Sequence, residues 1–147
     1  MKHSQVKRRW TYAGTCVFNL SYHIIWCPKY RRPLLVDGVD TFLRTMLEQR
    51  CAEYGWTIRS LEIMPDHVHL FLSVTPADSV AQVVSILKGG SAKELREHFP
   101  HLKRLLPTMW TRSYYVESVG HVSAKTIERY IHDQKTRPKV IRHSSHD

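Results

Sequence analysis

The sequence has few cysteines and no long apolar segment. Its three cysteines, Cys16, Cys27 and Cys51, are odd in number and form no Cys-x-x-Cys motif. This pattern argues against a disulfide framework or a zinc knuckle and favours reduced thiols in a cytoplasmic protein. No run approaches the roughly 18 apolar residues that a membrane-spanning helix needs. The first ten residues are polar and basic, so we expect neither a membrane span nor a secretory signal.

Acidic residues are also scarce relative to basic ones. The 147 residues include 22 Lys and Arg against 13 Asp and Glu, which leaves a formal net charge of +9. A basic domain of this size commonly binds a polyanion. Several basic clusters contain an aromatic residue, as a surface that grips phosphates and stacks bases needs. These clusters are Lys7–Trp10, Lys29–Arg32, His101–Arg104 and Lys135–Lys139. The composition therefore favours a nucleic acid partner, although a solvated charged surface explains any single cluster.

Length and hydrophobic periodicity predict one folded domain. A hydrophobic content of 42% is that of a globular chain, and we expect residues 1–12 and 138–147 to be mobile basic tails. Two-residue alternation predicts strands at 17–26, 56–64, 67–74 and 110–118. Helical spacing predicts helices at 37–54, 80–98 and 124–135.

Local signals mark where the predicted helices begin and end. Gly55 is suited to end the first helix, and Asp78 or Ser79 to cap the second. The pair Gly89-Gly90 is expected to interrupt or kink the second helix. The resulting order, β-α-β-β-α-β, predicts an α+β fold with a ferredoxin-like, RNA-recognition-like antiparallel sheet and an extra C-terminal helix. Two helices should cover one face of the sheet and leave the other free for a ligand.

Two histidines lie two residues apart in an apolar strand. Pro65-Asp66 forms a predicted turn, and His67 and His69 follow it. On a strand both side chains point to the same face, with Cβ atoms roughly 7 Å apart, so both imidazoles can reach one metal ion. We expect Val68 and Phe71 on the other face. The sequence has ten histidines, so two satisfied histidines with no metal remain an alternative. Asp66 is either a turn residue, which we favour, or a partner that orients a ligand histidine.

The last predicted helix carries a second polar pair. Tyr130 and Gln134 are four residues apart and share a helical face. Ile127 and Ile131 form an adjacent apolar stripe that can dock this helix on the sheet. Taken alone, Tyr130 is better explained as a packing aromatic and Gln134 as a residue exposed to solvent; the rest of the sequence reverses this balance.

Five motifs in order resemble a known family. They are Tyr22–Arg31, Met64–Leu70, Leu87–Ala92, Trp110–Tyr115 and Tyr130–Gln134. Together they resemble the HUH-type single-tyrosine transposases of small bacterial insertion sequences, the TnpA group. The resemblance extends from about Tyr22 to Gln134, and both histidines, the tyrosine and the glutamine are present.

The resemblance implies a mechanism and a set of site residues. Tyr130 would be the catalytic nucleophile, and His67, His69 and Gln134 would bind a divalent metal, Mg²⁺ or Mn²⁺. The family acts on single-stranded DNA with hairpins near the element ends and works as a homodimer, in which the active site is often shared between subunits. Gly120 is a candidate hinge for such sharing, although an ordinary turn glycine is nearly as well supported.

Four basic residues are candidates for contact with DNA. Lys29, Arg31, Lys88 and Arg112 lie within the matching motifs, and each has an alternative role as a solvated charge.

Three other functions stay open at the level of sequence. They are a domesticated relative that acts on palindromic genomic repeats, a non-catalytic RNA- or DNA-binding module, and a zinc hydrolase that uses His67 and His69. The hydrolase lacks a persuasive third ligand and a base. A metal-dependent covalent DNA adduct separates the transposase reading from the last two.

Overall fold

The computed structural model describes residues 11–13, 16–119, 129, 131 and 132 of the chain. The strands are β1 (Thr11–Ala13), β2 (Cys16–Phe18), β3 (Leu20–Trp26), β4 (Thr57–Met64), β5 (His67–Val74) and β6 (Tyr115–Val119). The helices are the 3-10 turn η1 (Lys29–Arg31), α2 (Val39–Tyr54), α3 (Val80–His98) and α4 (Pro100–Leu105). Thr11 and Tyr12, which we expected in a mobile tail, belong to β1; residues 1–10 and 138–147 lie outside the described part.

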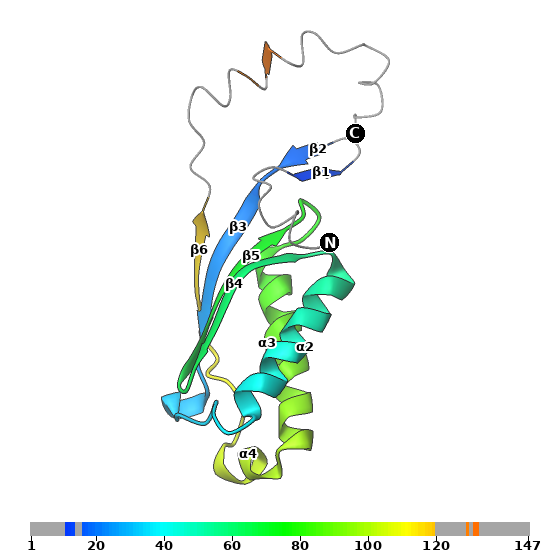
Figure 1. The fold of residues 1–147 in the computed structure, drawn as a ribbon. Helices are drawn as coiled ribbons and strands as arrows, with labels where there is room; N and C mark the ends of the chain where they lie inside the picture. The colour runs from blue at the N-terminus through cyan, green and yellow to red at the C-terminus, as the bar shows by residue number, and fades with distance from the viewer. Residues whose placement is uncertain (1–10, 14–15, 120–128, 130, 133–147) are drawn as a thin grey trace.

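Four strands form one antiparallel sheet in the order β4-β5-β3-β6. Helices α2 and α3 lie together against one face of it (Figure 1). This arrangement confirms the predicted α+β class and the β-α-β-β-α-β order. β1 and β2 form a separate two-stranded hairpin.

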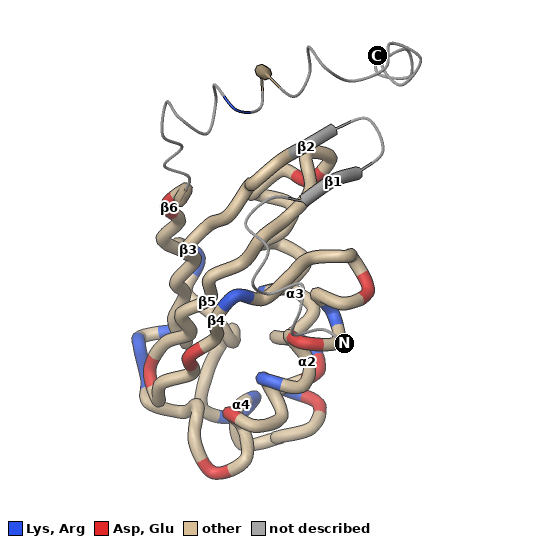
Figure 2. Tube along the Cα trace, turned by 45° about the horizontal axis from the view of Figure 1, so that its top comes forward, with Lys and Arg blue, Asp and Glu red and all other residues tan. Residues whose placement is uncertain are grey.

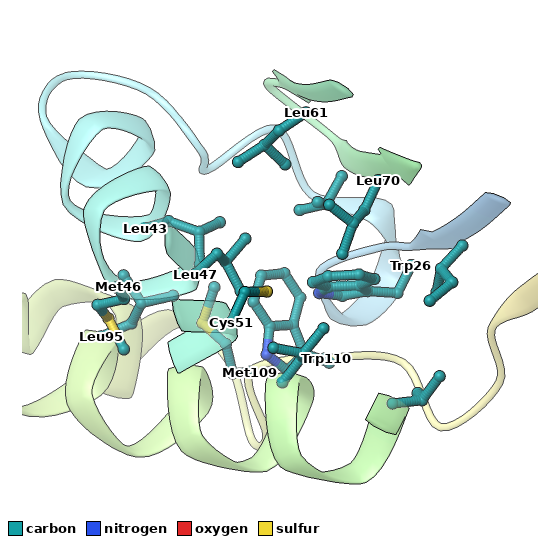
Figure 3. Packing of buried hydrophobic residues seen from close by; sticks show 14 of the residues in the cluster. Trp26, Leu43, Met46, Leu47, Cys51, Leu61, Leu70, Leu95, Met109 and Trp110 are labelled. Atoms are coloured by element: carbon teal, nitrogen blue, oxygen red, sulfur yellow. The ribbon is translucent and has the colours of Figure 1, made fainter. Parts of the chain in front are cut away.

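The hydrophobic core fills the space between the sheet and the two helices (Figure 3). Ile24 and Trp26 enter it from β3, and Leu70 from β5, each no more than 1% exposed. Trp110 packs edge-on against Trp26, with ring centroids 6.0 Å apart. Such aromatic pairs add stability beyond the area that they bury.

Several predicted boundaries are wrong for reasons of tertiary packing. The strand predicted at 17–26 is divided at Asn19, and the one predicted at 110–118 is displaced to β6. Trp110 lies in the segment before β6, and its buried indole donates to the Lys88 carbonyl and the Ser91 hydroxyl of α3. It makes only an isolated bridge with Pro28.

The helices follow the prediction more closely. Helix α2 begins two residues later than expected and ends at Gly55, whose φ of 77° is the left-handed conformation that glycine adopts readily. Ser79 caps α3 by accepting from the Gln82 amide. Helix α3 continues through Gly89-Gly90, so the expected interruption is wrong. Helix α4, which starts with a proline in its first turn, is not among the predicted elements.

Candidate functional site

The face of the sheet opposite α2 and α3 carries the histidine pair. Along β5, Val68 and Leu70 are fully buried in the core, whereas His67 and His69 alternate with them and are partly exposed. The predicted common face of the two histidines is therefore confirmed. The placement of Phe71 on the core face is wrong, because the two-residue period puts Phe71 on the histidine face.

The carboxylate of Asp66 lies between His67 and Arg31. Its Oδ1 is 2.9 Å from the His67 Nδ1, and the Arg31 Nε donates to its Oδ2 at 3.0 Å. The pKa of Asp66 lies below its usual value because of the hydrogen bond with His67, with a further contribution from Arg31 that opposes partial desolvation. Asp66 is thus a turn residue and also a partner of a candidate ligand, the two roles that the sequence left as alternatives.

This contact orients the His67 imidazole. When the Nδ1–H donates to a carboxylate, the Nε2 keeps its lone pair, which is the form of histidine that binds a metal. The position of the Asp66 carboxylate at Nδ1 therefore favours the His67 tautomer whose Nε2 is available to a metal ion.

The other candidate ligand, His69, contacts a third histidine. The His69 Nε2 is 3.1 Å from the Nδ1 of His23 on β3, and the His23 ring stacks on Phe71 with centroids 4.5 Å apart. On its other side, the His69 Nδ1 lies 4.0 Å from a carboxylate oxygen of Glu62 on β4.

Sequence reasoning did not select His23 as a site residue. Alternation along β3 puts Ile24 and Trp26 in the core and so puts His23 on the open face, which is a usable signal. Its meeting with His69 depends on the pairing of β3 with β5, where Ile25 lies opposite His69. The sequence alone does not specify that register.

The remaining catalytic candidates, Tyr130 and Gln134, lie outside the described residues, as does Gly120. Of the predicted last helix, Arg129, Ile131 and His132 are described, and their backbone is helical. Ile131 is half exposed, and Ile127, the other residue of the expected docking stripe, lies outside the described residues.

The described residues fit part of a divalent metal site. His67 and His69 supply two imidazoles on one face, a donor type that suits Mn²⁺ and other first-row ions better than Mg²⁺. No group of three or more His, Cys, Asp or Glu side chains within the described ranges can hold a metal ion. Among the described residues, the two imidazoles of His67 and His69 are thus not joined by a third His, Cys, Asp or Glu ligand, and a role for Gln134 stays a prediction.

The four candidate DNA contacts occupy different environments. Lys29 and Arg31 lie on η1, and Arg112 is exposed in the loop before β6. The Lys88 ammonium instead donates to the carbonyls of Thr111, Arg112 and Ser113, at 2.7 to 3.4 Å. Its pKa is lowered by burial. Lys88 thus holds the 111–113 loop in place, and direct contact of any of the four with DNA stays a prediction.

Charges of both signs are distributed over the described chain (Figure 2). Of the four basic clusters, Lys29–Arg32 includes η1 and His101–Arg104 lies on α4; Lys7–Trp10 and Lys135–Lys139 are outside the described residues. No helix within the described ranges is long and apolar enough to cross a membrane.

A ferredoxin-like antiparallel sheet with a His-x-His pair on its open face agrees with the transposase class that the motifs indicated. Residues 16–134 match the family model described as "Transposase IS200 like", and the chain belongs to this family. Family membership places it among enzymes that cleave and transfer DNA in the transposition of insertion sequences.

Individual relatives agree with this assignment. The chain is 39% identical over 120 residues to the ISDra2 transposase TnpA of Deinococcus radiodurans, which covers 80% of this chain and 86% of that protein. It is 34% identical over 125 residues to the IS200 transposase of Salmonella typhimurium, a match that covers 84% of this chain and 82% of that protein. A crystal structure of a transposase from Deinococcus radiodurans matches with a TM-score of 0.70 and 37% identity, over 84% of this chain and 97% of that one.

Proposed function

We propose that this protein cleaves and rejoins single-stranded DNA at the ends of an insertion sequence through a covalent 5′-phosphotyrosine intermediate on Tyr130. It would do so after binding hairpins near those ends. The observation that carries the proposal is the pair His67 and His69 on the open face of β5, with His67 oriented by Asp66.

The proposed chemistry needs one nucleophile and an electrophilic phosphate. A phenol has a pKa near ~10 and is a weak nucleophile at neutral pH. A divalent cation, Mg²⁺ or Mn²⁺, bound by His67, His69 and Gln134 would withdraw charge from the scissile phosphate. The Tyr130 oxygen attacks phosphorus as the bond to the 3′ oxygen breaks, which leaves a 5′-phosphotyrosine and a 3′-OH. A second 3′-OH reverses the step, so no ATP is needed.

The proposal includes a homodimer. Two DNA ends must be cut and exchanged, and each chain supplies one Tyr130. A tyrosine helix from one subunit would serve the histidines of its own chain or of the other. From the sequence, we expect the two subunits to pair along the edge of the strand predicted at 17–26 or of the strand predicted at 110–118. β3 lies between β5 and β6, so it is not an edge, whereas β6 pairs only with β3 and leaves its other side open in the described part.

A covalent-adduct assay tests the proposal. Labelled single-stranded DNA from the element end, incubated with the protein and Mn²⁺, should give a protein–DNA adduct, and blunt duplex DNA of the same sequence should not. Tyr130→Phe removes one oxygen and should abolish the adduct while hairpin binding survives. The double variant His67→Ala/His69→Ala should also abolish it, whereas Gln134→Ala should reduce it less, because water can replace one neutral ligand.

Peptide mapping identifies the nucleophile. The nucleotide should be found on the Tyr130 peptide. An adduct on the Tyr114-Tyr115 peptide, or cleavage by the double histidine variant, would contradict the proposed site. Tight hairpin binding without any adduct would instead support a non-catalytic DNA-binding module.

A further inference from the structure

Tyr30 presents its aromatic ring to solvent beside the candidate site. It is 70% exposed, more than any other large hydrophobic side chain that the structure describes. Most exposed tyrosines need no explanation, but this one occupies the central position of η1, between Lys29 and Arg31, and the backbone there is unusual.

The backbone of η1 holds Tyr30 in a conformation that side chains rarely adopt. Tyr30 has φ 60° and ψ 16°, and Arg31 has φ 54°. Consecutive left-handed residues other than glycine are costly and persist only where the surrounding structure imposes them. The Lys29 amide donates to the Met109 carbonyl and the Arg31 amide to the Pro28 carbonyl. The tight turn is thereby fixed to the loop that precedes β6, and its apex is Tyr30.

The same turn is joined to the histidine site by a short chain of contacts. Arg31 donates to Asp66, and Asp66 contacts His67. The Leu35 amide also donates to the Pro65 carbonyl, at 3.0 Å. Figure 1 shows η1 at the end of the sheet where β4 turns into β5. Tyr30 is therefore adjacent in sequence to Arg31, whose partner Asp66 contacts the candidate metal ligand His67.

Basic residues flank Tyr30 in the sequence, and one of them contacts its ring. The Lys29 ammonium lies 5.4 Å from the Tyr30 ring centroid, within cation–π range. Arg31 uses one of its five donors on Asp66 and has others for a phosphate. Arg32, also exposed, follows directly. An exposed aromatic flanked by cations is how sequence-tolerant proteins hold single strands: the ring stacks on a base while the cations contact the backbone.

We propose that Tyr30 stacks on one unpaired base of the single-stranded DNA substrate next to the scissile phosphate and so sets the register of the strand over His67. The inference rests on the proposed function, since it needs a single-stranded substrate. Phosphate contacts by Lys29 and Arg31 would not explain why an aromatic ring is exposed between them. A stacked base gives the Tyr30 ring a specific binding partner.

The test combines protein variants with an abasic scan of the DNA. Affinity for metal-free single-stranded end DNA is measured by fluorescence anisotropy for the wild type and for Tyr30→Ala, Tyr30→Phe and Tyr30→Gly. Tyr54→Ala is the matched control, because Tyr54 is also an exposed tyrosine, at 47%, but stacks on Trp56 at the end of α2. Each protein is assayed against DNAs in which one base at a time is removed.

Loss of one stacked base weakens binding by roughly 5- to 100-fold. We expect the affinity of Tyr30→Ala for intact DNA to fall by this factor. The affinities of Tyr30→Phe and Tyr54→Ala should stay close to that of the wild type. Removal of one base beside the cleavage site should lower the affinity of the wild type by the same factor as Tyr30→Ala does. The same abasic DNA should not lower the affinity of Tyr30→Ala any further. Tyr30→Gly relieves the left-handed strain, so its melting temperature should be unchanged or higher while its affinity falls as in Tyr30→Ala.

Three results overturn the inference. Equal affinities of wild type and Tyr30→Ala for every DNA would exclude stacking, as would a Tyr30→Ala defect that is the same at all abasic positions. A Tyr30→Ala variant that loses only self-association would assign the ring to a protein contact. Failure of the wild type to bind single-stranded DNA at all would instead contradict the proposed function, which keeps the two failures apart.

Discussion

At the scale of single residues, the Asp66 carboxylate orients the imidazole of His67. The carboxylate joins Arg31 on one side to the imidazole on the other, and residues that orient a metal-binding histidine affect affinity or activity by 10- to 100-fold. An exposed charge pair such as Arg31–Asp66 is worth little by itself, so its value here lies in placing the carboxylate.

We therefore predict that Asp66→Ala lowers the rate of DNA cleavage by about 10- to 100-fold, because His67 loses the acceptor that fixes its tautomer. Asp66→Asn keeps an acceptor oxygen and should recover part of the rate, and Arg31→Ala should be milder than Asp66→Ala. Single-turnover adduct formation measures the effect, with melting temperature as a control for folding. A wild-type rate for Asp66→Ala would show that the contact has no functional role.

A second carboxylate, Asp78, holds the loop between β5 and α3. Its Oδ2 accepts from the Trp56 indole at 2.8 Å, from the Thr75 amide at 2.9 Å and from the Thr75 hydroxyl at 2.7 Å. Burial raises the pKa of this carboxyl, but the hydrogen bonds from Thr75 and Trp56 outweigh burial, and the pKa lies below its usual value. The folded protein therefore favours the ionised form.

The sign of the pH dependence follows. A carboxyl whose pKa is lower in the folded state contributes stability above its unfolded pKa of about 3.9 and loses it as pH falls through the folded value. Asp78→Asn should lower the free energy of unfolding by about 1 to 3 kcal/mol at pH 7, and the difference from wild type should shrink below pH 4. Urea denaturation at several pH values measures this. The exposed Asp37 offers a control, since Asp37→Asn should change little; a pH-independent effect of Asp78→Asn would contradict the assignment.

At the scale of secondary structure, α3 tolerates a glycine pair in its middle. Gly89 is exposed, and a Cβ added there would meet no atom within 4 Å. At Gly90 an added Cβ would lie 2.7 Å from Nη1 of Arg50, whose guanidinium also lies 3.5 Å from Glu94. The absence of a side chain at Gly90 thus lets an arginine of α2 cross α3.

Alanine should act differently at the two positions. Gly89→Ala should stabilise the protein by about 0.5 to 1 kcal/mol, since glycine costs that much in a helix interior. Gly90→Ala should gain less, or lose stability, because Arg50 must move away from Glu94. The two variants serve as each other's control in thermal or urea unfolding. An equal gain at both positions would show that the Arg50 crossing contributes nothing.

Hydrophobic periodicity predicted an element correctly where the observed burial follows the same period. β5 was predicted to the residue because buried Val68, Leu70, Leu72 and Val74 alternate strictly with partly buried positions. The start of β6 was predicted five residues too early. Trp110 packs in the core against α3 instead of beginning the strand, and the two-residue alternation from Trp110 onward does not reveal that contact. A Gly-Gly pair suggested a break, but a modest propensity cost is overridden by packing in a 19-residue helix.

At the scale of the whole molecule, the candidate site combines local and distant residues. His67 and His69 are found from a two-residue period, and Asp66 from its adjacency to them. His23 lies 46 positions from His69 in the sequence, and Arg31 lies 35 positions from Asp66. These partners meet because β5 is paired with β3 and because η1 packs on the β4–β5 turn. Neither contact can be predicted from the hydrophobic pattern of a single sequence.

The last prediction concerns assembly through β6. In the described part this strand pairs only with β3, and Val116 on it is 36% exposed. An open strand edge with apolar side chains invites pairing with another chain, and a lysine on the edge opposes it. Val116→Lys should therefore convert the proposed homodimer to a monomer and reduce strand transfer. Leu105→Lys on α4 is the control, because Leu105 is similarly exposed, at 41%, and lies away from the edge. Sedimentation velocity at micromolar concentration measures both. A Val116→Lys variant that stays dimeric would place the interface elsewhere, and a monomeric wild type with full strand-transfer activity would rule out the dimer itself.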